Sequence, residues 1–301
     1  MPDEAGRDAV ASSARWIAAA RARESARTDR LFADPWAERL ASPDGFQMLS
    51  AREPDGRPNA YLPVRTRFFD DLVTLPRVQG SQVVLLGAGH DTRALRLPLA
   101  SSTTVYAVDR ENVLRATADV VAEASPTVLG AAGWQAVPAD LTADWAARLQ
   151  DSGFRAERAT VWIAEGLLFY LSGEQVHALL ADAAALSSEG SVLGADVFGT
   201  GLLRRAPMRP LVEHRTRTGT PLPFCTDDPA GLLRSTGWQV DRVVEPGQTG
   251  ANYGRLPTLP DDWNGGADPT MRTYLLVGVR RSRQGTGTDP AGQASGATGS
   301  T

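Results

Sequence analysis

Short apolar runs that alternate with helix-forming segments are the feature that most restricts how this chain can fold. Between residues 82 and 279 these runs have the length of buried strands, and helix signals separate most neighbours. This alternation is typical of a mostly parallel sheet with both faces covered. We expect seven strands, at residues 83–86, 104–108, 134–137, 160–164, 191–198, 238–244 and 274–279. The predicted fold class is therefore α/β.

The segment before the first strand has a different texture and predicts helices without a strand. Residues 12–27 are rich in helix formers, and Asp34-Pro35 ends that segment. Pro35 suits the first turn of a second, short helix through Leu40. Prolines and glycines predict a loop over residues 43–58, and residues 64–75 again indicate a helix.

These patterns divide the chain into three parts. We expect a helical lid at residues 1–78, a sheet domain at 79–281 and a disordered tail at 282–301, where small and polar residues predominate. Helices are expected at residues 113–124, 172–186 and 229–235. An irregular insertion at about residues 201–223, rich in proline and arginine, is predicted to wall a substrate pocket together with the lid.

Composition excludes several chemistries. All 31 basic residues are arginine, so a Schiff-base lysine, a P-loop lysine and a kinase lysine are absent. A net charge of -4 without a basic patch argues against nucleic acid and anionic lipid as partners. The single cysteine, Cys225, cannot alone form a thiolate metal site, and we expect no metal. Because the chain has no signal peptide pattern or membrane-length apolar run, we expect a cytoplasmic protein.

A glycine pair follows the first expected strand. Gly87 and Gly89 stand where the backbone must turn tightly and approach a ligand closely. A dinucleotide fingerprint would have a third glycine at the position of Thr92, so a nicotinamide-dependent oxidoreductase is disfavoured, although it stays an alternative. Packing alone can also place glycine at the end of a buried strand.

Acidic residues end the next two expected strands. Asp109 lies 20 residues beyond Gly89, where a carboxylate can accept both ribose hydroxyls of an adenosine, although a helix cap is the alternative. Asp140 and Leu141 follow the third strand and suit an adenine, because the carboxylate accepts from the amino group while the apolar side chain packs on the ring. Glycines and acids at three successive strand ends predict an adenosine site.

Five runs of the sequence together carry a resemblance to a known family. They are residues 65–70 (RTRFFD), 86–93 (LGAGHDTR), 108–109 (VD), 140–141 (DL) and 165–170 (EGLLFY). In this order and spacing they resemble the leucine carboxyl methyltransferase family, including its many bacterial members, over about residues 12–200. The C-terminal third resembles that family only loosely. The resemblance implies a class I methyltransferase with a Rossmann-like sheet and S-adenosyl-L-methionine as cofactor.

The resemblance also implies roles for particular residues. Arg65 would hold the methionyl carboxylate, although pairing with Asp70 or Asp71 on a helix surface is an alternative. The run from Glu165 to Tyr170 would face the methionyl end and the acceptor, which makes these two the candidate catalytic residues. The glycines, Asp109, Asp140 and Leu141 would complete the cofactor site, with Glu165 as a further cofactor contact.

A carboxylate acceptor fits the residues because it is ionised at neutral pH and needs no general base. Holding the two reactants together would then supply most of the catalysis. The expected acceptor is a small natural-product acid or a peptide. A hydroxyl acceptor would need a base, for which His214 in the insertion is the candidate. A non-catalytic adenosine-binding module is a further alternative, and oligomeric state stays open.

Overall fold

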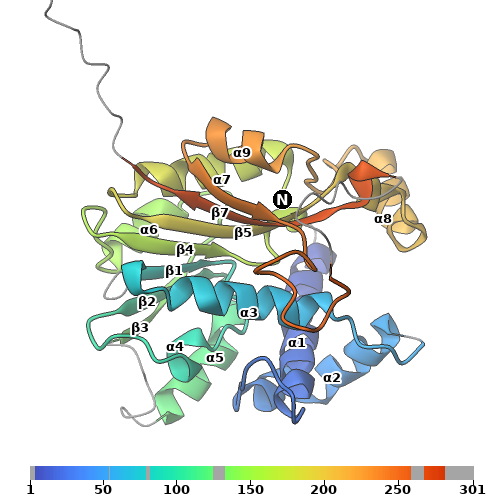
Figure 1. Cartoon of the computed structure of the whole chain (residues 1–301), viewed down its shortest axis with the longest axis horizontal. Helices are drawn as coiled ribbons and strands as arrows, with labels where there is room; N and C mark the ends of the chain where they lie inside the picture. Colours follow the sequence, from blue (N-terminus) through green and yellow to red (C-terminus); the bar gives the residue numbers. More distant parts are fainter. Residues whose placement is uncertain (1–3, 54, 79–81, 125–132, 259–267, 282–301) are drawn as a thin grey trace, which may run out of the picture.

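The fold is a seven-stranded sheet with helices on both faces and a helical layer at one edge (Figure 1). It is seen in a computed structural model that describes residues 4–53, 55–78, 82–124, 133–258 and 268–281. The strand order is β3-β2-β1-β4-β5-β7-β6. The first five strands along the chain pair in parallel, while β7 is antiparallel to both of its neighbours.

The strands agree with the expected positions to within a residue or two at each end. Their bounds are β1 Gln82–Leu86, β2 Thr104–Asp109, β3 Gly133–Pro138, β4 Thr160–Ala164, β5 Val192–Phe198, β6 Gln239–Val244 and β7 Thr273–Val279. Strands β1 and β4 are buried at every position, which explains their unbroken apolar runs. The predicted α/β class and mostly parallel sheet are confirmed.

A hydrophobic core lies on each face of the sheet, and different helices pack against each core. Helix α3 (Tyr61–Val73) packs its Phe68, Phe69 and Leu72 on one face. Helices α6 (Trp145–Asp151), α7 (Gly173–Ala185) and α9 (Pro229–Ser235) pack on the opposite face. The side-chain oxygen of Ser172 caps α7, and Gln175 completes the predicted capping box.

The N-terminal helices form a third layer. Helices α1 (Glu4–Ser25) and α2 (Ala37–Arg52) pack through buried alanines and leucines against α4 (Arg93–Arg96) and α5 (Glu111–Glu123). The described residues before β1 include no strand, as expected. The prediction of a loop from residue 43 was wrong, because α2 continues to Arg52. A kink at Ser42, with φ of 54°, places Pro43 where a new helical turn starts and needs no N–H donor.

The expected irregular insertion is partly helical. It contains two short 3-10 turns, Thr200–Arg204 and Ala206–Met208, followed by helix α8 (Arg209–Thr218). No residue of α8 is buried, so hydrophobic periodicity could not reveal this helix. In Figure 1, α8 lies on the right, beyond the end of β5, at the edge where the parallel strands end. The tail at 282–301 lies outside the described residues.

In the described part of the chain, no helix combines the length and apolar character that a membrane crossing requires.

Candidate functional site

The glycine loop turns sharply at the end of β1. Gly87 and Gly89 have φ of 62° and 54°, a left-handed conformation that favours glycine. The N–H groups of Gly87 and Ala88 both donate to the carbonyl of Val108, which ties the loop to β2. A Cβ at Gly87 would lie 2.7 Å from Leu167, in the segment that follows β4. The loop therefore needs glycine at 87 for its conformation, and the end of the Leu167 side chain would have to shift for a Cβ there.

Asp109 joins the glycine loop to the end of β2. Its Oδ2 accepts from the Gly89 N–H at 2.8 Å, and its Oδ1 accepts from the Arg110 N–H at 2.7 Å. The residue preceding α5 is Arg110, so Asp109 is not that helix's capping residue. Burial raises the pKa of Asp109, while the two backbone N–H groups partly offset this effect. Each carboxylate oxygen retains a lone pair that a ribose hydroxyl can use.

Asp140 and Leu141 lie beyond the end of the neighbouring strand β3. The N–H of Ala139 donates to the carbonyl of Asp109 at 2.9 Å, which brings the two strand ends together. Asp140 is exposed and its Oδ1 accepts from the backbone and hydroxyl of Thr142, whereas Leu141 is half-buried against the core. The structure thus places Asp140 at the same sheet edge as Asp109, although in a more open position.

Arg65 and Glu165 meet at the ends of the central strands. Arg65 is buried on α3, and its Nε donates to Glu165 Oε1 at 3.0 Å. Its Nη1 lies 3.3 Å from Oδ2 of Asp196, a fully buried side chain on β5. Local pairing of Arg65 with Asp70 or Asp71 does not occur, since those carboxylates bind Arg93, Arg96 and Arg67 instead. Arg65 therefore points to the sheet edge.

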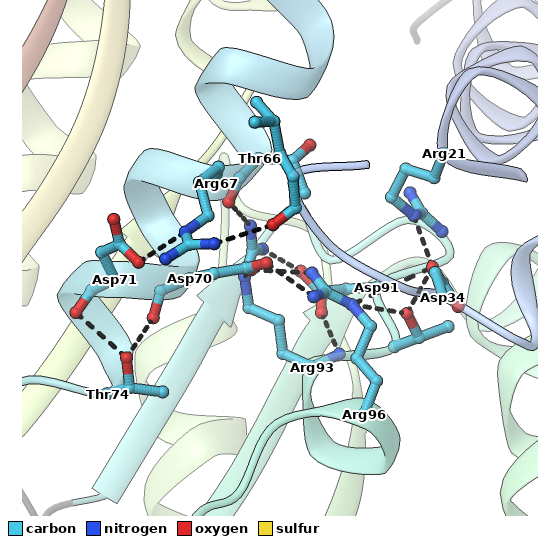
Figure 2. Close-up of polar contacts among 12 residues, drawn as sticks. Arg21, Asp34, Thr66, Arg67, Asp70, Asp71, Thr74, Asp91, Arg93 and Arg96 are labelled. Atoms are coloured by element: carbon cyan, nitrogen blue, oxygen red, sulfur yellow. Dashed lines mark hydrogen bonds and ion pairs between the residues drawn. The ribbon is translucent and has the colours of Figure 1, made fainter. Parts of the chain in front are cut away.

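Buried ion pairs connect this point to the N-terminal helices, and Figure 2 shows the part that runs from Arg93 and Asp70 to Asp34 and Arg21. Arg93 contacts Asp70 of α3, Asp91 of the glycine loop and Glu165. Arg96 donates to both oxygens of Asp70, and the hydroxyl of Thr92 donates to Asp34 at 2.7 Å. Since unpaired buried charges are costly, this network constrains the helices and the glycine loop to one arrangement.

The charges around Glu165 keep it ionised. Burial alone would raise its pKa, but Arg93 and Arg65 overcome that effect and lower the pKa to about 2. Burial lowers the pKa of both guanidinium groups, but their carboxylate partners more than compensate, so the net direction is upward. Glu165 is therefore a permanent anion at neutral pH and a poor proton acceptor.

Four aromatic side chains, two of which closely follow Glu165 in the sequence, pack on one another. Tyr170 is 39% exposed and packs edge-on to Phe169, with ring centroids 6.0 Å apart. Phe169 in turn contacts Phe198 at the end of β5, which contacts Tyr61 of α3. This chain of half-buried and exposed rings borders the strand ends. Tyr170 thus lies near Glu165 in sequence and at the outer end of the aromatic group.

The histidines lie in different surroundings. His90 is buried in the glycine loop, where burial, together with Arg21, lowers its pKa to about 4. His177 lies on the exposed side of α7, and His214 is exposed on α8 with Arg217 nearby. Arg204 of the insertion pairs with Asp268. Among the other insertion arginines, Arg205, Arg209 and Arg217 are exposed.

Sequence reasoning missed three members of the site, Arg93, Asp196 and Tyr61. The Tyr61 hydroxyl donates to Asp196 Oδ2 at 2.7 Å, and the Gly166 N–H donates to Asp196 Oδ1 at 2.6 Å. A signal for Asp196 was present, because it is a lone acid inside the apolar strand Val192–Phe198. The same argument from the cost of an unpaired buried charge identified Glu165.

The residues at this sheet edge suit S-adenosyl-L-methionine. Its methionyl end carries an ammonium and a carboxylate, for which Glu165 and Arg65 have the opposite charges, and Asp109 offers acceptors for ribose hydroxyls. A methyltransferase from Thermobifida fusca has a similar fold, with a TM-score of 0.52, 16% identity and coverage of 87% of this chain and 94% of the other. The fold is that of the class I methyltransferases.

Comparison of the sequence with known proteins narrows this class to one family. The profile described as leucine carboxyl methyltransferase matches residues 14–184. A relative from Mycolicibacterium gilvum, assigned as S-adenosyl-L-methionine-dependent methyltransferase, is 37% identical in an alignment of 289 positions that covers 86% of this chain and 91% of the relative. Another from Parafrankia sp. is 43% identical in an alignment of 199 positions that covers 62% of this chain and 61% of the relative. The chain belongs to the leucine carboxyl methyltransferase family and uses S-adenosyl-L-methionine.

Proposed function

We propose that this enzyme transfers a methyl group to a carboxylate oxygen of a small natural product or a peptide and so forms a methyl ester. The observation that carries the proposal is the position of Glu165 between the guanidinium groups of Arg65 and Arg93, which lower its pKa to about 2 and make it unsuitable as a general base. A carboxylate acceptor needs no base, since it is ionised at neutral pH. The family of the matching profile also supports a carboxyl acceptor.

The histidines give a hydroxyl acceptor little support. His90 is buried beneath α1, and its Nδ1 faces the hydroxyl of Thr117 at 3.5 Å. His214, the candidate base, lies exposed on α8, a helix that buries none of its residues. Among the described residues no hydrogen bond joins His90 or His214 to Glu165, although α8 lies at the edge where the parallel strands end. Methylation of a hydroxyl is therefore the alternative outcome that an analysis of the product must distinguish.

We assign the cofactor contacts to the residues at the strand ends. S-adenosyl-L-methionine supplies an electrophilic methyl group when it is bound. Arg65 would pair with the methionyl carboxylate, Glu165 with the ammonium, and Asp109 with the ribose hydroxyls. Gly87 and Gly89 would let the backbone lie against the methionyl part, while Asp140 and Leu141 would contact the adenine.

The acceptor would lie between the aromatic group and the helical elements at the sheet edge. Tyr170 follows Glu165 closely in the sequence and has an exposed ring, so we assign it to acceptor contact rather than to proton transfer. The N-terminal helices and the insertion at 201–223 would act as the lid that excludes water. Catalysis then consists mainly of orientation, which can contribute roughly 7 to 11 kcal/mol.

Product analysis tests the acceptor. The enzyme is incubated with methyl-labelled S-adenosyl-L-methionine and sets of carboxylic acids, C-terminal peptides and phenols, and labelled products are treated with alkali. A methyl ester releases volatile methanol under these conditions. Label that is transferred to phenols and survives alkali would overturn the carboxyl proposal without affecting the cofactor assignment.

Calorimetric titration tests the cofactor contacts. We expect Asp109→Ala to weaken S-adenosylhomocysteine binding by tenfold or more, because the variant loses a charged acceptor for the ribose. Asp144→Ala is the matched control, since this aspartate also follows β3 but is exposed and pairs with Arg148. Equal affinity for the wild type and Asp109→Ala, with both proteins folded, would refute the assignment of Asp109.

A further inference from the structure

We propose that Arg93 is a positioning residue, which holds the Glu165 carboxylate toward the methionyl end of the cofactor and keeps it ionised. This inference rests on the cofactor site proposed above, and it concerns a residue that has no assigned contact with the cofactor. Arg96, which lies on the same short helix α4, serves as the natural comparison. The two arginines share a carboxylate partner but differ in whether they reach Glu165.

Arg93 is placed with little freedom. Only 2% of its side chain is exposed. Its Nε donates to Asp70 at 2.8 Å, its Nη1 contacts Asp91, and its Nη2 donates to Glu165 Oε2 at 2.6 Å and to the Thr66 carbonyl at 3.3 Å. Every guanidinium nitrogen therefore has a partner. Because the guanidinium is a rigid planar fork, these partners determine where the Nη2 that meets Glu165 can lie.

Glu165 depends on a small number of neighbours. From α3, Arg65 and Thr66 donate to its Oε1, at 3.0 and 3.3 Å, whereas Arg93 from α4 donates to Oε2. Arg21 of α1 adds a more distant positive charge. Asp196 of β5 competes with Glu165 for Arg65. Arg93 thus orients the oxygen that Arg65 does not.

Two other carboxylates that bind Arg93 increase the effect that its removal would have on Glu165. Asp70 and Asp91 also bind Arg93, so its removal would leave two acidic side chains near Glu165 with one fewer cation. Burial and these negative charges would then both raise the pKa of Glu165. In a variant without Arg93, a larger fraction of Glu165 would therefore be protonated as the pH falls, and the protonated form could not attract the cofactor's ammonium.

Arg96 provides a matched control. Its side chain is 3% exposed, nearly as buried as that of Arg93. It donates to both oxygens of Asp70, at 2.6 and 2.7 Å, and to the hydroxyl of Thr92 at 3.2 Å. In the described part of the chain, Arg96 forms no hydrogen bond with Glu165. Replacing Arg96 therefore disturbs the same buried network without removing a contact to Glu165.

The experiment measures S-adenosylhomocysteine affinity by calorimetry between pH 5.5 and 8 for the wild type, Arg93→Gln, Arg93→Lys and Arg96→Gln. We expect the wild type to be nearly independent of pH. Arg93→Gln should bind at least tenfold more weakly at pH 6 and should recover severalfold by pH 8, as Glu165 ionises. Arg93→Lys should restore the flat profile, because it retains the positive charge.

A purely structural role would lower affinity equally at every pH, and similarly for Arg93→Gln and Arg96→Gln; that result would overturn the inference. Adding Glu165→Gln to Arg93→Gln should abolish the pH dependence, since the titrating group is then gone. If Arg93→Gln does not fold, Arg93→Lys against Arg96→Lys decides the matter: lysine keeps the charge but not the planar fork, so Arg93→Lys should bind severalfold more weakly at every pH and Arg96→Lys should not, whereas equal affinities would overturn the inference. Wild-type affinity in Glu165→Gln alone would instead refute the proposed cofactor contact.

Discussion

At the scale of single residues, Gly166 controls how closely Arg65 approaches the end of β4. Its φ is 63°, and a Cβ at this position would lie 2.8 Å from Nη1 of Arg65. Arg65 cannot move away freely, because Glu165 and Asp196 both bind it. The absence of a side chain at Gly166 therefore allows Arg65 to lie against the end of β4 while it binds both carboxylates.

We predict that Gly166→Ala lowers the free energy of unfolding by roughly 1–2 kcal/mol through the left-handed backbone, and also weakens S-adenosylhomocysteine binding by displacing Arg65. Gly190→Ala is the control, since Gly190 has φ of 84° and a Cβ there would have no other atom within 4 Å. Gly190→Ala should lower the free energy of unfolding by a similar amount and leave the affinity for S-adenosylhomocysteine unchanged. Urea unfolding and calorimetry measure both quantities, and unchanged affinity in Gly166→Ala would contradict this account.

At the scale of elements, α1 is attached to the glycine loop by Arg21. Its Nε donates to Asp34 at 2.8 Å, and its Nη2 donates to the carbonyl of His90 at 2.5 Å. Asp34 also accepts from Thr92, in the loop that leads into α4. A helix far from the sheet in sequence therefore shares buried polar contacts with the segment that would hold the cofactor.

We predict that Arg21→Gln increases hydrogen exchange in α1 and in the glycine loop together, because it leaves the buried Asp34 without its main charged partner. Breaking one member of a buried pair costs roughly 3–5 kcal/mol. Arg15→Gln removes an exposed pair with Asp44 from the same helix and should change exchange little. Increased exchange confined to α1 would show that the glycine loop does not depend on this contact.

At the scale of the whole molecule, the N-terminal helices and the sheet domain share one packed interior. Leu95 of α4 and Val120 of α5 lie in the same hydrophobic cluster as Ala18 of α1 and Leu40 of α2. His90 is buried where these layers meet the glycine loop. A charge forced onto His90 should therefore affect the free energy of unfolding of the whole fold.

We predict a loss of stability on mild acidification. Burial, with a contribution from Arg21, lowers the pKa of His90 to about 4, below the ordinary value of about 6.5. Between these values the unfolded chain binds more protons, so stability falls as pH decreases through this window, by about 2 kcal/mol from pH 7 to pH 5. Urea unfolding at the two pH values should show a smaller loss of stability for His90→Gln than for the wild type. His177→Gln should lose as much as the wild type, because the His177 side chain is exposed. Equal losses in all three proteins would contradict a role for His90.

Much of the fold was predictable from local patterns. The expected strands end within a residue or two of the observed ones, because a buried parallel strand must be apolar on both faces and stop at a turn. Helix α8 was not predictable as a helix, since it buries no residue and has no apolar periodicity. The path of α2 through Pro43 depended on a kink at Ser42, which local propensity does not specify.

The sequence by itself determined which residues end the strands, namely Gly87, Gly89, Asp109 and Glu165, because short strands bring their final residues to one sheet edge. Only the tertiary structure decided their partners. Pairing of Glu165 with Arg65 joins residues 100 positions apart, and its pairing with Arg93 joins residues 72 apart. Such contacts follow from how α3 and α4 pack on the sheet, and a buried charge can be satisfied by any opposite charge that packing brings within reach.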